Sequence, residues 1–129
     1  MIFDCNEILI TDETLGCSLT FAEKENFKND IINDYRKNQG QYLMLLLIYK
    51  EDELEEDFLY IETKDPFKSG EIKVFVIHIY PNKFSICYEK DDIEINLKVN
   101  EKELDNLKHI INKIANKKGQ INFHTELFI

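Results

Sequence analysis

FVIHIYPNKFSICYEKDDIEINL, residues 75–97, is the stretch that decides the fold. Large apolar side chains alternate with small or polar ones through three short runs, a pattern typical of β-strands with one buried face. With two-residue turns at Pro81-Asn82 and Lys90-Asp91, the three runs pair as an antiparallel meander. The pairing places one apolar set on a common face: Phe75, Ile77, Ile79, Phe84, Ile86, Tyr88, Ile93, Ile95 and Leu97. A slip of one residue would scatter this set over both faces, so the pattern predicts the register.

Further strands are predicted on either side of this stretch. Residues 42–50 are apolar on both faces, which favours a central strand covered on each side. The short connections predict a five-strand meander made of residues 42–50, 58–64, 72–80, 84–89 and 92–99. Residues 7–11 and 15–19 predict an N-terminal hairpin, and the alternation in residues 121–129 predicts a C-terminal strand that returns to the sheet.

Two helices are expected to pack on this sheet. Thr20 and Glu23 have the spacing of a capping box, and apolar residues in the following segment predict a helix over about 21–38. Asn100 and Glu103 repeat that spacing before an apolar stripe, which predicts a second helix over about 101–117. The fold class is therefore α+β, mainly antiparallel sheet with two helices.

Composition indicates one domain in a reducing compartment. A chain of 129 residues has the usual size of a single domain, here 1–129, and 43% hydrophobic residues argue for a packed core. Cys5, Cys17 and Cys87 are odd in number and widely spaced, unlike a secreted disulfide framework. The longest apolar stretch, residues 42–49, is too short to cross a bilayer. We expect a cytoplasmic protein without a disulfide.

The net charge of −9 disfavours direct binding to nucleic acid or to anionic membranes, both of which reward clustered cations. Much of the acid is concentrated between two predicted strands. Six of the seven residues in 51–57 are acidic: Glu51, Asp52, Glu53, Glu55, Glu56 and Asp57. This run predicts a crowded hairpin loop that either keeps the protein soluble or docks Lys and Arg side chains of a partner. Calcium binding is a further alternative, although the glycine-centred EF-hand pattern is missing.

Other candidate residues are fewer. Tyr60 and Tyr80 are expected to face outward and to serve as interface anchors, since tyrosine is favoured there. His78, Cys87 and Asn96 share the mixed face of the meander, which leaves a nucleophilic trio open as an alternative. No histidine has metal-ligand spacing to another histidine or to a cysteine. We therefore expect no catalytic residue, no metal and no cofactor.

In size, acidity, α+β composition and acidic loop, the chain resembles the small immunity proteins of bacterial polymorphic-toxin and contact-dependent growth inhibition systems. The tryptophan-containing signature of one widespread immunity superfamily is absent. The resemblance implies a cytoplasmic protein, monomeric by preference, that binds one cognate basic toxin. The toxin would often be a nuclease, whose active site or substrate groove is occluded.

Two other classes of function stay open from the sequence. A dimeric acidic chaperone for a secreted effector would have similar size and charge, and it would bury the mixed sheet face or a helix in its dimer. A small enzyme would need a pocket that holds Cys87, His78 or paired carboxylates with perturbed pKa values.

Overall fold

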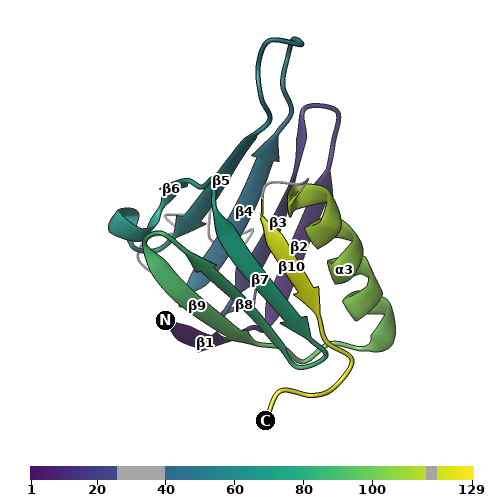
Figure 1. Ribbon diagram of the computed structural model, residues 1–129. Helices are drawn as coiled ribbons and strands as arrows, with labels where there is room; N and C mark the ends of the chain where they lie inside the picture. Colours follow the sequence, from purple (N-terminus) through teal and green to yellow (C-terminus); the bar gives the residue numbers. More distant parts are fainter. Residues whose placement is uncertain (26–39, 116–118) are drawn as a thin grey trace.

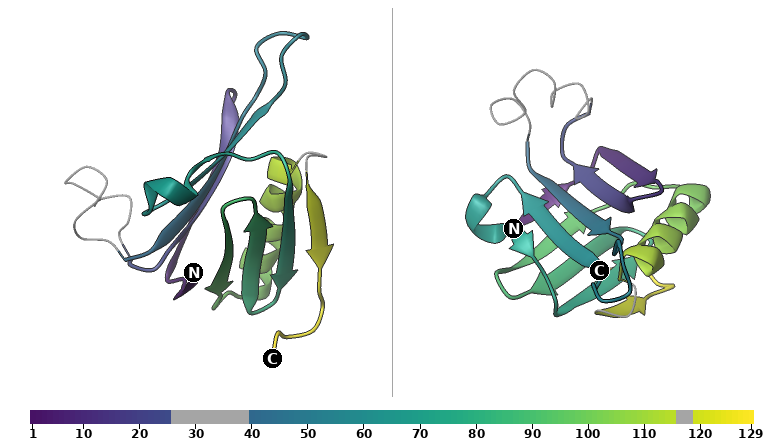
Figure 2. Two further views of the ribbon diagram at one scale, coloured as in Figure 1. Left: turned by 60° about the vertical axis from the view of Figure 1, so that its left-hand side comes forward. Right: turned by 90° about the horizontal axis from the view of Figure 1, so that it is seen from above.

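The described residues fold into two five-stranded sheets that pack face to face, with an α-helix along their side (Figure 1). The computed structural model describes residues 1–25, 40–115 and 119–129. In the edge-on view of Figure 2 the sheets form two layers. The α+β class is confirmed in its coarse form, with mostly antiparallel strands and a single α-helix among the described residues.

We call the two layers sheet I and sheet II. Sheet I has the order β2-β3-β4-β5-β6 and is antiparallel throughout. Its strands are β2 (Glu7–Asp12), β3 (Gly16–Ala22), β4 (Tyr42–Ile48), β5 (Phe58–Thr63) and β6 (Gly70–Glu71), with the short 3₁₀ helix η1 (Pro66–Lys68) between the last two. Sheet II has the order β1-β9-β8-β7-β10. Its strands are β1 (Ile2–Asp4), β7 (Phe75–Tyr80), β8 (Lys83–Tyr88), β9 (Asp91–Asn96) and β10 (Gln120–Phe123).

The core lies between the two sheets and is built by alternation along each strand. In sheet I the buried positions include Leu19, Phe21, Leu43, Leu45, Leu47, Leu59 and Ile61. In sheet II every member of the predicted apolar face is buried, from Phe75 to Leu97. Because side chains alternate across a strand, one continuous apolar layer forms between the sheets. The outward positions of β4 are apolar as well, as its sequence predicted, and they include Met44, Leu46 and Ile48.

Helix α3 (Glu101–Ala115) closes one side of this sandwich, as Figure 1 shows. The backbone N–H of Glu103 donates to the Asn100 side chain at 2.8 Å, and the Glu103 carboxylate accepts from the Asn100 N–H at 3.3 Å. This reciprocal pair is the predicted capping box. Leu107, Ile110, Ile111 and Ile114 are buried, so the predicted apolar stripe is the face that packs on the sheets.

The predicted buried face of residues 75–97 is confirmed, although one of the two turns lies elsewhere. Tyr80 pairs with Lys83, so the first turn is Pro81-Asn82 as predicted. The second turn differs, because Tyr88 pairs with Asp91 and the turn residues are Glu89 and Lys90. That change shifts the pairing by two residues, and a shift of two leaves every side chain on its predicted face.

The single five-strand meander is wrong, because the chain changes sheet inside the predicted strand 72–80. The N–H of Ile72 still bonds to the carbonyl of Leu59 in sheet I at 3.0 Å, whereas Phe75 pairs with Tyr88 in sheet II. Residues 73 and 74 are exposed and carry the crossing. The strand thus ends without a glycine or proline at the crossing, and the alternation is interrupted by one residue, because Lys73 and Val74 are both exposed between buried Ile72 and Phe75.

Three further predictions need correction. Of the predicted helix 21–38, Phe21 and Ala22 belong to strand β3, because the inward alternation of Cys17 and Leu19 continues to Phe21. Residues 26–39 lie outside the described residues, so two helices are not matched. The predicted strand 121–129 is the shorter β10, and it pairs parallel with β7. Strand β1, parallel to β9, was missed because three residues are too few to show a pattern.

Candidate interaction surface

The acidic residues 51–57 lie in the hairpin loop that joins β4 to β5, as predicted. Ile48 pairs with Phe58 at the last rung of the ladder, and the loop continues beyond it. In Figures 1 and 2 this hairpin extends well past the body of the sandwich. Its carboxylates therefore reach solvent on a projection rather than on a flat face.

Three of the six acids also accept hydrogen bonds from the loop backbone, among them Glu55, which accepts from the Glu51 N–H at 3.5 Å. Asp57 accepts a hydrogen bond from the Lys50 N–H at 2.8 Å and closes the base of the loop. Asp52 accepts from the Leu54 N–H at 2.7 Å and forms a turn at the tip. The side chains of Glu51, Glu53, Glu55 and Glu56 are exposed. In the described parts of the chain, no ion pair joins these four to a cation.

Apolar side chains accompany the acids. Leu54 at the tip is 97% exposed, an extreme value for a leucine that contacts no core. Ile48 and Phe58 face each other at the base and are partly exposed. Tyr60, predicted as an anchor, lies next along the same outer face, and its ring stacks on Phe58 with centroids 6.4 Å apart. Apolar residues rimmed by charge are the usual composition of a protein-binding surface.

We call this set the hairpin surface: residues 51–57 together with Ile48, Phe58 and Tyr60. Tyr80 does not belong to it. It lies in sheet II beside the turn Pro81-Asn82, at the end of the molecule away from the acidic hairpin in both figures. In a single five-strand meander the turn Pro81-Asn82 would lie at the same end as the acidic loop, and the change of sheet at residues 73–74 separates them.

The base of the hairpin is fastened to helix α3. The ammonium of Lys113 lies 2.8 Å from both carboxylate oxygens of Asp12, at the end of β2. Tyr49, the first residue after β4, buries its hydroxyl beside Lys113 and Cys17. Burial raises the pKa of Tyr49 and that of Cys17, while the Asp12 carboxylate raises the pKa of Lys113. All three groups thus keep their protons, and the cluster holds the hairpin on a fixed support.

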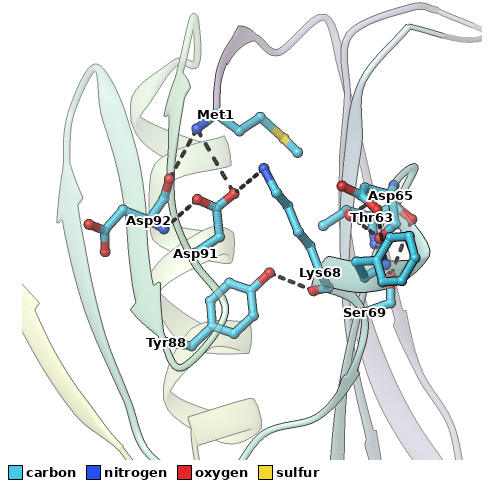
Figure 3. A network of polar contacts seen from close by, with 9 residues as sticks. Met1, Thr63, Asp65, Lys68, Ser69, Tyr88, Asp91 and Asp92 are labelled. Carbon is cyan, nitrogen blue, oxygen red and sulfur yellow. Dashed lines mark hydrogen bonds and ion pairs between the residues drawn. The ribbon is translucent and has the colours of Figure 1, made fainter.

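A second polar network joins the two sheets at the edge formed by η1 and the β8–β9 turn (Figure 3). The Lys68 ammonium lies 3.0 Å from the Asp91 carboxylate, and the Tyr88 hydroxyl donates to the Lys68 carbonyl at 2.6 Å. Burial raises the pKa of Tyr88 to about 12. Burial alone would raise the pKa of Asp91, but Lys68 and the Asp92 N–H lower it below its usual value. This network holds the two sheets together at that edge.

The structure does not bring His78, Cys87 and Asn96 together. Cys87 pairs with Val76, and His78 pairs with Ser85, two residues further along the ladder. The Cys87 thiol is exposed, and its hydrogen bond to Asp92 raises its pKa, which favours the less nucleophilic thiol form. Asn96 instead donates to the Asp4 carboxylate at 2.8 Å.

His78 has a different partner, which the sequence reasoning missed. Its Nδ1 lies 2.9 Å from Nε2 of His124, although 46 residues separate them in the chain. If β10 had been assigned beside β7, the sequence would have placed His78 and His124 on the same face of neighbouring strands. Within the described residues, no group of three or more His, Cys, Asp or Glu side chains is arranged to hold a metal ion.

A hollow of about 480 Å³ lies on the outer face of sheet I. Its lining includes Tyr42, Tyr60, Glu62 and Lys64.

The described part of the chain holds no helix long and apolar enough to cross a membrane. Comparisons with protein-family models, with curated proteins and with solved structures find no match.

Proposed function

We propose that this protein is a cytoplasmic binding protein that neutralises a basic toxin, with the hairpin surface as its docking site. The toxin would be a nuclease effector, and the acidic hairpin would enter its active site or substrate groove. The protein would act by occlusion and would catalyse no reaction. The observation that carries the proposal is the projecting hairpin, which combines exposed acids with the exposed Leu54 at its tip.

The physical argument for a nuclease rests on complementary charge. A protein that cleaves nucleic acid needs a groove lined with Lys and Arg to hold the phosphate backbone. A projection that carries six carboxylates in seven residues presents a similar density of negative charge to that groove. Such complementarity steers association and favours one partner over others.

The apolar part of the surface supports the same proposal. Charge at an exposed rim contributes mainly to the rate of encounter, whereas buried apolar anchors dominate residence time. Leu54, Ile48 and Phe58 would supply those anchors once the partner covers them. A loop that served solubility alone would have no use for a leucine at its tip.

The proposal is tested by capture from lysate of the native cell, with the tagged protein and a charge-neutral hairpin variant as baits. That variant carries Glu51→Gln, Asp52→Asn, Glu53→Gln, Glu55→Gln and Glu56→Gln. A matched control removes five exposed charges elsewhere through Glu25→Gln, Glu89→Gln, Glu101→Gln, Asp105→Asn and Glu126→Gln. We expect the native protein and the control to retain the same basic protein, and the hairpin variant to lose it.

The captured protein is then purified and assayed for cleavage of DNA and RNA. The proposal requires that cleavage occurs and that stoichiometric addition of the native protein suppresses it. A captured protein that is acidic, or that the hairpin variant and the control retain equally, would contradict the docking site. A basic protein without nuclease activity would contradict the toxin class and leave the docking site standing.

A further inference from the structure

The strongest unassigned feature is the contact between His78 and His124 on the outer face of sheet II. His78 projects from β7, and His124 follows β10, whose parallel pairing with β7 is extended by a 2.9 Å bond from the His124 N–H to the Ile79 carbonyl. Nδ1 of His78 and Nε2 of His124 are 2.9 Å apart. Both side chains are half-buried, so the contact is built into the sheet.

Ring positions show that the contact is a head-on hydrogen bond. The two imidazole centroids are 5.2 Å apart, which is about the 2.9 Å contact plus one ring radius on each side. Tyr80 lies flat on His124, with centroids 4.0 Å apart and planes 5° apart. The His78 and Tyr80 centroids are 6.4 Å apart, so the three ring centroids form a nearly right-angled triangle with the right angle at His124. His78 thus meets the edge of the His124 ring while Tyr80 covers its face.

The same site holds the chain that follows β10, residues 124–129. The Asn82 side chain donates to the Phe128 carbonyl at 3.0 Å and accepts from the Phe128 N–H at 2.8 Å. The Phe128 ring stands edge-on to Tyr80, and the Lys83 ammonium lies 4.0 Å from the Phe128 ring centroid. Residues 124–129 are therefore attached at two points, the imidazole pair and Asn82.

The charges around the imidazole pair come from each neighbouring element. Strand β8 supplies the Lys83 ammonium, which is 3.1 Å from the Glu94 carboxylate of β9. Strand β7 supplies the phenol of Tyr80, and β10 supplies the neutral Asn122 opposite His78. Glu126, on the attached segment, is exposed. Among the described residues, no ion pair joins a carboxylate to either imidazole.

We propose that residues 124–129 form a pH-sensitive latch whose closed state depends on the proton count of the imidazole pair. With one proton between the two facing nitrogens, one ring donates and the other accepts. A first added proton gives an imidazole–imidazolium pair, in which the neutral ring still accepts and the bond is kept. When both rings are cationic, each facing nitrogen carries a proton, neither can accept, and two positive charges meet at 2.9 Å. Imidazole is the side chain that gains its proton between neutral and mildly acidic pH. Acidification therefore opens the latch and uncovers Tyr80 and Lys83.

The test measures hydrogen–deuterium exchange of the Phe128 amide, which is bonded to Asn82 in the closed state. Protection factors, which correct for the intrinsic exchange rate, are compared at about pH 7.5 and about pH 5. In the native protein we expect protection to fall by about tenfold or more, the loss of one hydrogen bond that involves a charged group. The control His109→Gln, at an exposed site on α3, should show the same fall.

The variant His78→Asn separates the latch from a general acid effect. Its amide oxygen can accept from Nε2 of His124 at any pH, so we expect Phe128 protection to stay high at both values. As a second measurement, ¹⁵N signals of both imidazoles in the native protein should change over the same pH range as Phe128 protection. Equal native protection at both pH values, or imidazole signals that change over a different range, would overturn the proposal. So would a fall in the variant as large as in the native protein.

Discussion

The rings of Phe21 in sheet I and Phe84 in sheet II lie 4.6 Å apart, centroid to centroid, and are tilted by 37°. Both side chains are fully buried. This is the closest aromatic contact between the two layers among the described residues. We expect Phe21→Ala and Phe84→Ala each to lower the free energy of unfolding by about 3–5 kcal/mol.

Urea denaturation of both single variants and the double variant measures this directly. The double-mutant cycle should give a coupling of about 0.5–1.5 kcal/mol, as for other aromatic pairs. Phe67→Ala is the matched control, because Phe67 is 87% exposed and its loss should cost under about 0.5 kcal/mol. Strict additivity of the two single effects would contradict the contact.

The second prediction concerns the faces of the β7–β8–β9 meander. Ile86 is buried and its neighbour Ser85 is on the outer face. We expect Ile86→Ala to destabilise by about 2–4 kcal/mol and Ser85→Ala by under about 1 kcal/mol in the same denaturation assay. If Ser85→Ala were the more costly change, the strand would be turned the other way.

The agreement between sequence and structure in this region has a physical cause. Nine apolar residues over three strands fix which face is buried, and even the misplaced second turn did not change a single side chain's face. The assignment to sheets had no such constraint. Sheet I and sheet II share one apolar layer, and the change of sheet shows in the sequence only as a one-residue break in the alternation, between buried Ile72 and buried Phe75.

The acidic hairpin and the imidazole pair also differ in how far the sequence could predict them. The acidic hairpin was predictable because its position depends only on the pairing of β4 with β5. The imidazole pair was not, because it depends on which strand β10 joins, and 46 residues separate its members. Tyr80 was misplaced relative to the hairpin because the change of sheet at residues 73–74 was not predicted.

A third prediction follows from the ion pair between Lys68 and Asp91. Because the pKa of Asp91 is lowered in the folded protein, the unfolded chain binds its proton more readily. The pair therefore stabilises the fold above the unfolded value near 3.8 and loses its contribution as pH falls through the lower folded value. Denaturation between about pH 6 and about pH 3 should show a shallower acid-induced loss of stability in Lys68→Met than in the native protein. Parallel curves would mean that the pair contributes nothing.

The fourth prediction concerns the three thiols. Cys5 and Cys17 are buried and Cys87 is exposed, all as free cysteines. Burial also raises the pKa of Cys5 to about 11, which keeps it in the unreactive thiol form. A thiol reagent at about pH 8 should label one equivalent in the native protein and three in denaturant without reductant. Fewer than three in denaturant would reveal a disulfide.

The fifth prediction separates the two parts of the hairpin surface by kinetics. With the purified partner, the charge-neutral hairpin variant should associate more slowly, and rising salt should reduce the association rate of the native protein in the same way. Leu54→Ala should instead leave association nearly unchanged and speed dissociation. Surface plasmon resonance at two salt concentrations measures both rates. An unchanged association rate in the charge-neutral variant would move the docking site away from the hairpin.

The parallel edges of sheet II have a consequence for how the chain folds. The strands β7, β8 and β9 can pair as soon as they are made, because each turn closes a short loop. Strand β1 reaches its place beside β9 only across about ninety residues, since Ile2 pairs with Glu94. Loop-closure entropy opposes such distant contacts until the intervening chain is ordered. Within sheet II we therefore expect the β7–β8–β9 ladder to form before β1 and β10 join its two edges.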